Sequence, residues 1–374
     1  MPSLDRRALN RALLARQWLL DPPRAATPLA AIEHLLGLQA QDVKAPYFQL
    51  WPRIADFDPT ELSALLEARE AVRIVVMRGT IHLVSARDAL LLRPIVQEVI
   101  TRATEGNWGA GAEGVDRAEL AAAGRALVDA EPRTFAQLGA LLAERWPEAD
   151  PPSLAQHIRA RVPLVQVPPR GLWRRSGAPA HTSIENWVGD AAAAAAPVPT
   201  IDAVVRRYLG AFGPASVQDM QKWSGLTRLA AAFERLRGEL VSFTDAETGK
   251  RELFDLPDAP RPPASTPVGP RLVGPFDNLI LSHADASRVL PVEHRQKVMT
   301  QNGLIAGMVL IDGFVAGNWR IKATKKLATL TIATFGSKAY RKKDQAAIAR
   351  DGDRLLRFAA PEAARREVAF TAPG

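Results

Sequence analysis

A repeated order of local patterns limits the fold of this chain more than any other feature of its sequence. In the first round, helical spacing of apolar residues over 4–20, 28–36 and 59–67 is followed by two β-rich runs on either side of Arg78-Gly79. Two further rounds have helical spacing over 116–127, 134–145 and 153–161, and then over 201–209, 216–223 and 227–236. Their hairpins are expected at 162–167 with 172–173, and at 240–243 with 252–254. Three helices followed by a hairpin is the order of a winged helix module, so we expect three such modules in tandem.

The pattern changes after a proline-dense stretch at 257–270. Beyond it, the sequence predicts strands over 271–273, 278–281, 304–310, 313–319 and 328–334 and a final helix over 340–358. Asp312-Gly313 lies between two apolar runs and is a strong signal for a two-residue hairpin. We therefore expect an α+β fold, in which three winged helix motifs precede an antiparallel, β-rich C-terminal region. The expected modules span 1–95, 96–196 and 197–265, and the C-terminal region spans 266–374.

Positive charge is concentrated near the C-terminal end. The formal net charge is +8, and residues 286–350 contain twelve Lys or Arg against three acids, which gives that segment +9. A charged, solvated surface explains such a run, and a nucleic acid partner is the first alternative. On the second interpretation, the DNA-binding residues lie at the tip of a hairpin and at the start of the final helix. They are Arg320, Lys322, Lys325, Lys326, Arg341, Lys342 and Lys343.

Composition excludes several classes of protein and site. The chain has no cysteine, so disulfides, thiolate metal sites and a cysteine nucleophile are excluded. No apolar run reaches the roughly 18 residues of a membrane span, and the N-terminus lacks a signal-peptide pattern. We therefore expect a soluble, cytoplasmic protein with no membrane partner. Because the sequence has neither a phosphate-binding glycine loop nor a His-Glu-x-x-His zinc motif, we expect no cofactor and no metal.

The stretch 36–41 places two uncharged amides where an apolar helix pattern ends. Gly37 stands where a helix C-cap is expected, and an extended chain after it would put Gln39 and Gln41 on one side. A buried amide without a partner costs about 1–3 kcal/mol, so a pair at the edge of a core suggests a polar ligand. A helix end followed by two ordinary surface glutamines explains the same spacing.

Two histidine-containing patterns invite functional interpretations. His82 lies in an apolar strand, where a satisfied core histidine is favoured over a role as a neighbour of a site. The cluster Ser282, His283 and Asp285 has the residues of a catalytic triad. Neighbours in one turn cannot align as nucleophile, base and orienting group, so we expect a structural turn with Asp285 near Arg288.

Four segments together resemble the AlkZ and YcaQ family of bacterial DNA glycosylases. They are Leu36–Gln41 with Ala45–Tyr47, Met77–Val84, Gly274–Asp285 and Asp312–Arg320, in the order of the family. The resemblance implies a C-shaped protein of tandem winged helix motifs whose concave, basic face holds double-stranded DNA. It also implies base excision repair of alkylated purines or unhooking of interstrand crosslinks, as general repair or as self-resistance to a toxin. A nucleoid-associated enzyme of the bacterial cytoplasm is then expected.

The resemblance also implies that Gln39 and Gln41 are catalytic. The family element is a glutamine, an apolar residue, and then glutamine or aspartate, and Gln39-Ala40-Gln41 is the AlkZ-like form. The YcaQ-like branch has aspartate at the position of Gln41, so this chain lacks that carboxylate. Asp42 is adjacent but out of phase, and it would point away from an extended stretch.

Two amides are sufficient for one class of substrate. A purine alkylated at N7 or N3 is already cationic, so its departure needs no general acid, unlike the leaving group of an O-glycoside. Amide oxygens can then orient a water and stabilise the oxocarbenium-like sugar. The family resemblance implies a monofunctional hydrolase without a Schiff base.

Two other functions fit the same charge pattern. One is a catalytically silent winged helix DNA-binding protein or transcriptional regulator, and the other is an RNA-binding protein, although no RNA-binding module is recognisable. A regulator would be expected to dimerise on paired half-sites, whereas three modules in one chain favour a monomer.

Overall fold

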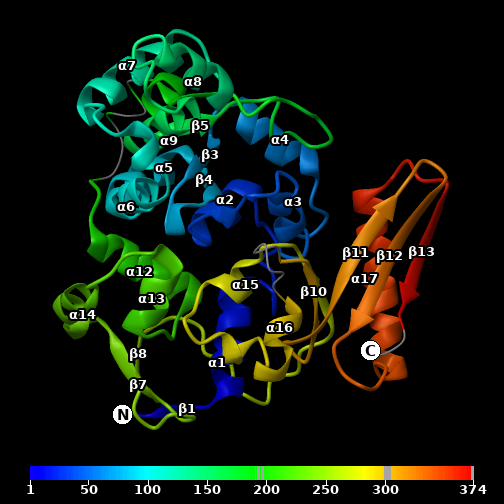
Figure 1. Cartoon of the computed structure of the whole chain (residues 1–374). Coiled ribbons are helices and arrows are strands. Elements are labelled where there is room, and N and C mark those ends of the chain that lie inside the picture. Colours follow the sequence, from blue (N-terminus) through cyan, green and yellow to red (C-terminus); the bar gives the residue numbers. More distant parts are fainter. Residues whose placement is uncertain (190, 192–193, 195–197, 299–304, 372–374) are drawn as a thin grey trace.

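The fold was obtained as a computed structural model that describes residues 1–189, 191, 194, 198–298 and 305–371. In these residues the strands form three sheets, with helices packed against them (Figure 1). The fold is therefore mixed α+β, and most strand pairs are antiparallel, as predicted. None of the described helices is long and apolar enough to cross a lipid bilayer.

The first sheet joins the first two rounds of the sequence. Its spatial order is β2 (Leu38–Gln39), β4 (Ile81–Ser85), β3 (Ala71–Val75), β5 (Leu164–Gln166) and β6 (His181–Ser183), and all neighbouring pairs are antiparallel. The β3–β4 hairpin turns at Arg78-Gly79 through the 3₁₀ helix η1 (Met77–Gly79), as predicted. Because β5 pairs with β3, this sheet crosses the predicted boundary between the first two modules.

The predicted second hairpin is wrong in its second strand. Residues 172–173 form no strand, and β5 pairs instead with β6. Trp173 packs on the rings of Tyr47, at 4.8 Å between centroids, and Phe358, at 4.9 Å. The apolar residues of this stretch are therefore used in packing between distant segments and not in a strand ladder.

The helices of the first round precede the β3–β4 hairpin, and all of them except α3 begin at side-chain caps. Asp5, Thr27 and Asp58 accept a backbone N–H at the starts of α1, α2 and α4. The helices are α1 (Arg6–Arg16), α2 (Pro28–His34), α3 (Ala45–Leu50) and α4 (Pro59–Glu67).

Two helices that the sequence did not predict follow β4. They are α5 (Ala86–Ile95), capped by Ser85, and α6 (Gln97–Trp108). Three predicted helices come next and enclose a separate apolar core that includes Leu120, Leu138 and Ile158. The remaining elements of this part are η2 (Ala110–Ala112), α7 (Arg117–Ala130), α8 (Phe135–Ala143), α9 (Pro151–Arg161) and α10 (Ile184–Val188).

The third round has the predicted order of three helices and a hairpin. The antiparallel hairpin of β7 (Val241–Asp245) and β8 (Glu252–Asp255) is extended by β1 (Ser3–Leu4), which pairs in parallel with β7. The N-terminal residues of β1 are therefore part of the sheet of the third round. The helices are α12 (Ile201–Phe212), α13 (Val217–Ser224), α14 (Ala230–Leu236) and η3 (Arg237–Glu239). Of the alanine run 191–196, predicted as a linker or helix end, residues 192, 193, 195 and 196 lie outside the described residues.

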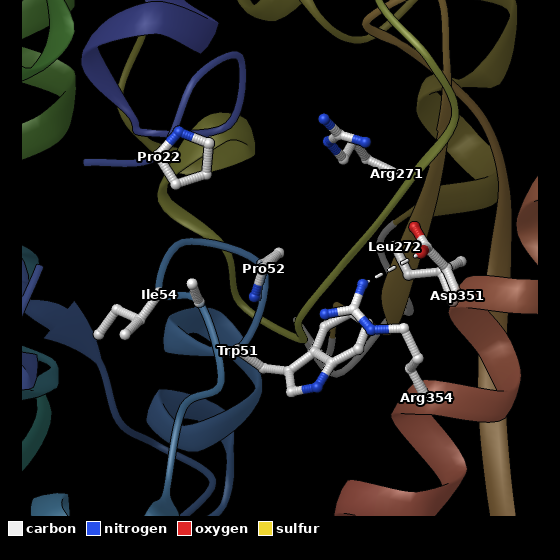
Figure 2. A pocket seen from close by; sticks show the side chains of 9 residues that line it. Pro22, Trp51, Pro52, Ile54, Arg271, Leu272, Asp351 and Arg354 are labelled. Carbon is white, nitrogen blue, oxygen red and sulfur yellow. Dashed lines mark hydrogen bonds and ion pairs between the residues drawn. The ribbon is translucent and has the colours of Figure 1, made fainter. Parts of the chain in front are cut away.

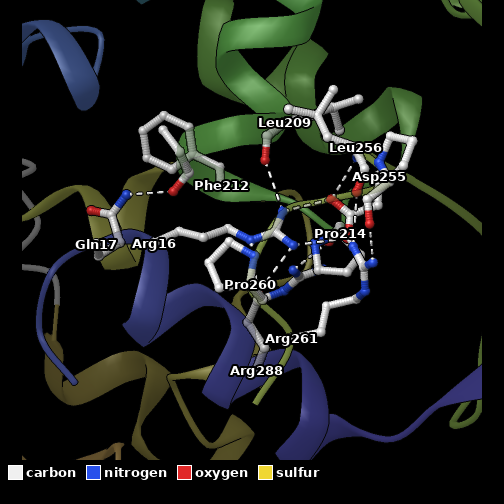
Figure 3. A network of polar contacts seen from close by, with 12 residues as sticks. Arg16, Gln17, Leu209, Phe212, Pro214, Asp255, Leu256, Pro260, Arg261 and Arg288 are labelled. Atoms are coloured by element: carbon white, nitrogen blue, oxygen red, sulfur yellow. Dashed lines mark hydrogen bonds and ion pairs between the residues drawn. The ribbon is translucent and has the colours of Figure 1, made fainter. Parts of the chain in front are cut away.

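A buried ion-pair network fixes α1 to the third round (Figure 3). Arg16 donates two hydrogen bonds to the carboxylate of Asp255, at 2.6 and 2.8 Å, and one to the carbonyl of Leu209. Arg261, in the proline-dense stretch 257–270, donates to the same carboxylate. Since arginines of α1 also donate to the carbonyls of Pro260, Ala264 and Thr266, that stretch packs along α1 and is not a free linker.

The C-terminal sheet has the order β13-β12-β11-β10-β9, and the last helix packs against it. Asp312 and Gly313 both have positive φ, at 51° and 84°, and form the predicted two-residue turn between β10 and β11. Figure 1 shows the long β11 and β12 beside α17. The elements are β9 (Arg271–Val273), β10 (Gly307–Ile311), β11 (Phe314–Ala323), β12 (Leu327–Thr334), α17 (Lys342–Ala359) and β13 (Arg365–Phe370).

Two predictions for this region need correction. Residues 278–281 form helix α15 (Asn278–Leu281) and not a strand, because Asp277 caps the N–H of Leu279 and turns the chain. The chain does not end in its last helix, since β13 follows and pairs in parallel with β12. The short elements η4 (Ala286–Arg288), η5 (Val292–His294) and α16 (Arg295–Val298) lie before β10, and the predicted strand start at Leu304 lies outside the described residues.

Candidate active site

The glutamine stretch lies at the start of the first sheet because α2 ends in a tight turn. Leu36 and Gly37 have φ values of 54° and 95°, and the N–H of Gly37 donates to the carbonyl of Ile32. A Cβ at Gly37 would lie 2.5 Å from Cγ1 of Val84, so the close approach of β2 to β4 requires glycine. The turn delivers Gln39 directly into register with His82 of β4.

Gln39 is held on both its side chain and its backbone. Its side chain is only 8% exposed, and its Oε1 accepts a hydrogen bond from Nη2 of Arg78 at 2.7 Å. Its carbonyl accepts one from Nε2 of Gln49 at 2.9 Å. Since an arginine only donates, the amide oxygen and not the nitrogen faces Arg78.

Gln41 is exposed and lies just beyond the end of β2. Its Oε1 accepts from the backbone N–H of Ile81 at 3.1 Å. Both amide oxygens therefore bind donors from the short segment 78–82, which the chain reaches through the β3–β4 turn. Each carbonyl oxygen retains a second lone pair for a water or a substrate.

His82 contacts the same guanidinium as Gln39. It is 1% exposed, its Nδ1 lies 3.0 Å from the carbonyl of Thr80, and its Nε2 lies 3.3 Å from Nη2 of Arg78. Nδ1 therefore carries the ring proton and Nε2 accepts. Burial, together with the charge of Arg78, lowers the pKa of His82 to about 3, so the ring is neutral and unsuited to act as a general acid at neutral pH.

Arg78 is the residue that sequence reasoning missed. It has φ of 56°, and its Nη1 donates to the carbonyl of Trp223 at the end of α13. Burial lowers the pKa of Arg78 to about 10, so it keeps its charge at neutral pH. Its position in the segment Met77–Val84, one of the four that carry the family resemblance, was the available signal.

The segment Gly274–Asp285 supports the glutamine stretch from behind. Asn278 donates to the carbonyl of Gly37 at 2.9 Å, and Gln49 donates to the carbonyl of Pro275 as well as to that of Gln39. A fully buried ion pair between Arg53 and Asp277, at 2.7 and 2.9 Å, fixes this segment to the first round.

In the cluster Ser282, His283 and Asp285, the Ser282 hydroxyl lies 3.3 Å from Nδ1 of His283, but the other ring nitrogen contacts a backbone carbonyl and not Asp285, so the three residues form no triad. His283 is 3% exposed, and its Nε2 donates to the carbonyl of Phe212. Asp285 caps the turn at Ser287, as expected of a structural role, but it pairs with Arg251 and not with Arg288. Arg288 contacts Asp219 instead, because its side chain is buried against α13.

Asp42 faces a different cavity from Gln41. Asp42 and Lys44 line a cavity of about 520 Å³ together with Arg320 of β11, whereas Gln41 lines a neighbouring cavity of about 280 Å³. The charge of Asp42 nevertheless acts to raise the pKa of Arg73, which lines the cavity of Gln41. Among the described residues, no group of three or more histidines and carboxylates is arranged to hold a metal ion.

The seven predicted DNA-binding residues form two groups. Arg320, Lys322, Lys325 and Lys326 are all exposed on the β11–β12 arm, whose strand β11 reaches Ala323 and is longer than predicted. Arg341, Lys342 and Lys343 begin α17 and are also exposed. Their neighbour Tyr340 donates to the carbonyl of Ala316, near the start of β11, so the α17 start lies at the end of the arm opposite to Lys325 and Lys326, with Arg320 between them opposite Thr331.

Comparisons with known proteins identify the family of this chain. The profile of the family described as DNA glycosylase AlkZ-like matches residues 32–358. The chain belongs to this family. The interstrand DNA cross-link repair glycosylase of Streptomyces sahachiroi is 33% identical over 126 residues, and this match spans 32% of the chain and 33% of the relative's length. The solved structure of the DNA glycosylase AlkZ from Streptomyces sahachiroi has the same fold, with a TM-score of 0.79, 22% identity, and coverage of 99% of this chain and 100% of that chain.

A third cavity, of about 230 Å³, contains none of the predicted site residues (Figure 2). It lies between Trp51, Arg271 of β9 and the face of α17 that carries Asp351 and Arg354. The guanidinium of Arg354 lies over the Trp51 ring, 5.3 Å from its centroid, and pairs with Asp351. The charged side chains of α17 in this cavity therefore serve to pack α17 against the first round.

Proposed function

We propose that this chain is a monofunctional DNA glycosylase that hydrolyses the N-glycosidic bond of cationic purines alkylated at N7 or N3 in double-stranded DNA. The observation that supports the proposal is the pair of amides, Gln39 and Gln41, whose oxygens are both fixed by donors of the segment 78–82. Fixed dipoles stabilise developing charge without reorganising during the reaction, and this is usually the largest single contribution to catalysis.

The two amides differ in what they can do. The oxygen of Gln39 already accepts from a guanidinium cation, which makes its second lone pair a weaker acceptor and its Nε2–H a stronger donor. Within the described part of the chain, the oxygen of Gln41 accepts only from a neutral backbone N–H. We therefore assign to Gln41 the stabilisation of positive charge on the sugar, and to Gln39 the orientation of the attacking water.

The charge of the site selects its substrate. Neither amide donates a proton, and His82 is neutral, so the leaving purine must carry its own positive charge. After the bond breaks, the purine leaves as a neutral base, the water forms the hydroxyl group at C1′, and the second proton of that water passes to solvent. Neutral damaged bases are then poor substrates.

For DNA engagement, we propose that the three helix-and-sheet rounds act as tandem winged helix motifs in a C-shaped monomer. The exposed cations of the β11–β12 arm and of the α17 start would contact phosphates. Because a curated relative is named as an interstrand DNA cross-link repair glycosylase, the proposal extends to crosslinks and bulky adducts, in repair or in self-resistance.

The test uses a duplex that contains one N7-methylguanine. Incubation with the protein followed by alkali should cut the strand at that base, and borohydride should trap no covalent complex. Gln39→Ala and Gln41→Ala should each lower the single-turnover rate by about 10²-fold, with DNA affinity changed only a few-fold. Gln296→Ala, at an exposed glutamine of α16, is the matched control. An intact strand at stoichiometric protein would reject the proposal in favour of a silent DNA-binding protein.

A further inference from the structure

The cavity of about 280 Å³ beside Gln41 contains an unusual group of side chains. We call it the arginine cavity. Besides Gln41, its lining includes three arginines and a pair of stacked rings, and no Asp or Glu lines it. These residues are Arg73, Arg159, Arg170, Phe135 and His181.

The three arginines of this cavity have no ionic partner among the described residues. Arg73 donates to Gln166 and to the carbonyl of Ala40, Arg159 to Gln156, and Arg170 to the carbonyl of Gly177. By contrast, the buried arginines at 16 and 53 each hold a carboxylate in a two-pronged contact. Burying a charge without a counterion is costly, and Arg73 is buried while Arg159 and Arg170 are half-buried. The charge of Asp42, which acts to raise the pKa of Arg73, offsets the positive charge of this cavity only in part.

Two buried nitrogen atoms in the arginine cavity lack hydrogen-bond partners within the part of the chain that the structure describes. Nε of Arg170 and Nδ1 of His181 are both buried without a hydrogen-bond partner among the described residues. His181 is 5% exposed and is held by stacking on Phe135, with 4.3 Å between ring centroids and 4° between planes. A buried polar atom without a partner is expensive, so a ligand that satisfies Arg170 would bind with a net gain.

Burial and the neighbouring arginines both affect the pKa values of the groups in this cavity. Burial, together with the nearby Arg170, lowers the pKa of Arg73 to about 10. Burial, with a smaller contribution from the neighbouring arginines, lowers the pKa of His181 to about 4, against the opposite effect of the Arg133 backbone. An anion in the cavity would oppose this mutual repulsion.

We propose that the arginine cavity binds a backbone phosphodiester of the damaged strand, next to the lesion. The planar guanidinium fork matches a phosphate geometrically, and the cavity has room for one phosphate group with several waters. Each deoxyribose has a phosphate on both sides. If Gln41 faces the sugar of the lesion, a flanking phosphate of the same strand is the anion that lies nearest to this cavity. This inference rests on the proposed function and adds a positioning site to it.

The cavity also has a mechanistic consequence. A phosphate held beside Gln41 fixes the sugar relative to the amide and leaves the base itself free of tight enclosure. Placement through the backbone suits a bulky or crosslinked base, which cannot be turned easily into a closed pocket.

The experiment replaces one phosphate at a time by a neutral methylphosphonate in the N7-methylguanine duplex. With the wild-type protein, one position beside the lesion in the damaged strand should lower the excision rate by about tenfold to a hundredfold. Arg170→Gln and Arg159→Gln should show a similar loss on the normal duplex, with little further loss from that methylphosphonate. The variant Arg175→Gln, an exposed arginine of the same loop outside the cavity, should respond like the wild type.

Each other result would overturn the inference. The inference fails if no phosphate is sensitive to replacement, or if the only sensitive phosphate lies in the opposite strand. It also fails if every methylphosphonate lowers the rate of Arg170→Gln by the same factor as it lowers the rate of the wild-type protein. Arg73 is left unchanged because it also holds the carbonyl of Ala40. If no excision occurs, the equilibrium affinity for the same set of methylphosphonate duplexes still tests the phosphate site. Failure of the phosphate site and failure of the proposed activity are therefore distinguishable.

Discussion

Arg78 donates from Nη2 to the side-chain oxygen of Gln39 at 2.7 Å, and the same nitrogen lies 3.3 Å from Nε2 of His82. Its Nη1 donates to the carbonyl of Trp223 at the end of α13. One guanidinium therefore connects the glutamine stretch, the strand beside it and a helix of the third round. The rotamer of Gln39 depends on this connection, because no other hydrogen bond to its Oε1 is present within the described residues.

Arg78→Ala should lower the single-turnover excision rate by about tenfold to a hundredfold, because a misplaced positioning group costs this much even far from the chemistry. DNA affinity should change only a few-fold. Addition of millimolar guanidinium should restore part of the rate, since the substitution leaves a cavity of that shape, and a purely structural role would not respond in this way. If Arg78→Ala excised the base at the wild-type rate while Gln39→Ala was slow, Gln39 would not need the hydrogen bond from Arg78.

The neutral state of His82 predicts a dependence of stability on pH. Its pKa is about 3 in the folded protein and 6.5 when unperturbed, so below pH 6.5 the unfolded chain binds a proton that the folded protein does not. Stability is therefore lost as the pH falls from 6.5 towards 3, by about 2 kcal/mol for this histidine between pH 6.5 and pH 5. Burial also lowers the pKa of His283 to about 3 and that of His181 to about 4, which adds losses of the same sign.

Urea unfolding between pH 5 and 6.5 measures this effect. His82→Gln, which keeps an acceptor for Arg78, should reduce the pH slope by about a third, because it removes one of the three histidines whose pKa falls to about 4 or below. His34→Gln is a useful comparison, since that ring is less deeply buried and its pKa is lowered to a smaller extent. An unchanged slope in His82→Gln would mean that His82 is protonated in the folded protein.

Local signals predicted much of this fold because they act over a few residues. The helices predicted over 59–67 and 134–145 begin at the caps Asp58 and Thr134, which contact near neighbours only. The predicted turn at Asp312-Gly313 is local in the same way. The errors arose where distant partners decide. Residues 172–173 pack on Tyr47 and Phe358, and β13 forms only because β12 offers it a free edge.

The same distinction applies to the candidate site. The sequence alone predicts that Gln39 and Gln41 lie on the same side of an extended stretch, but the hydrogen-bond donors that hold them come from residues about forty positions away. No pattern within 36–41 identifies Arg78, and none within 159–181 shows that Arg159, Arg170 and His181 meet beside Gln41. Side chains brought together by pairing of β3 with β5 become visible only in the folded protein.

Neutralising the tip of the β11–β12 arm should weaken DNA binding in a salt-dependent way. Lys325→Gln with Lys326→Gln should reduce the slope of log Kd against log salt by about two, because each phosphate contact releases about one counterion. Arg24→Gln with Lys250→Gln removes the same charge from exposed positions elsewhere and should leave the slope unchanged. Fluorescence anisotropy over a salt series provides the measurement, and an equal reduction in both pairs would remove the tip from the DNA surface.

Gly37 offers a test of the turn that delivers the glutamine stretch. Its φ of 95° disfavours any side chain, and a Cβ would also lie 2.5 Å from Cγ1 of Val84 and 3.0 Å from the carbonyl of Leu83. Gly37→Ala should therefore lose about 2–4 kcal/mol of unfolding free energy, from backbone strain and overpacking together. Gly114→Ala shares the positive φ, at 74°, but meets no atom within 4 Å, so it should lose only about 1 kcal/mol. The difference in unfolding free energy between the two variants isolates the contact with β4.

The same variants test whether the turn positions the site. Because relief of the clash must push β2 away from β4, Gly37→Ala should also reduce excision at temperatures where the variant is fully folded, whereas Gly114→Ala should not. Circular dichroism in urea and single-turnover assays give the two readings, and equal behaviour of both variants would show that the position of Gln39 does not depend on this turn.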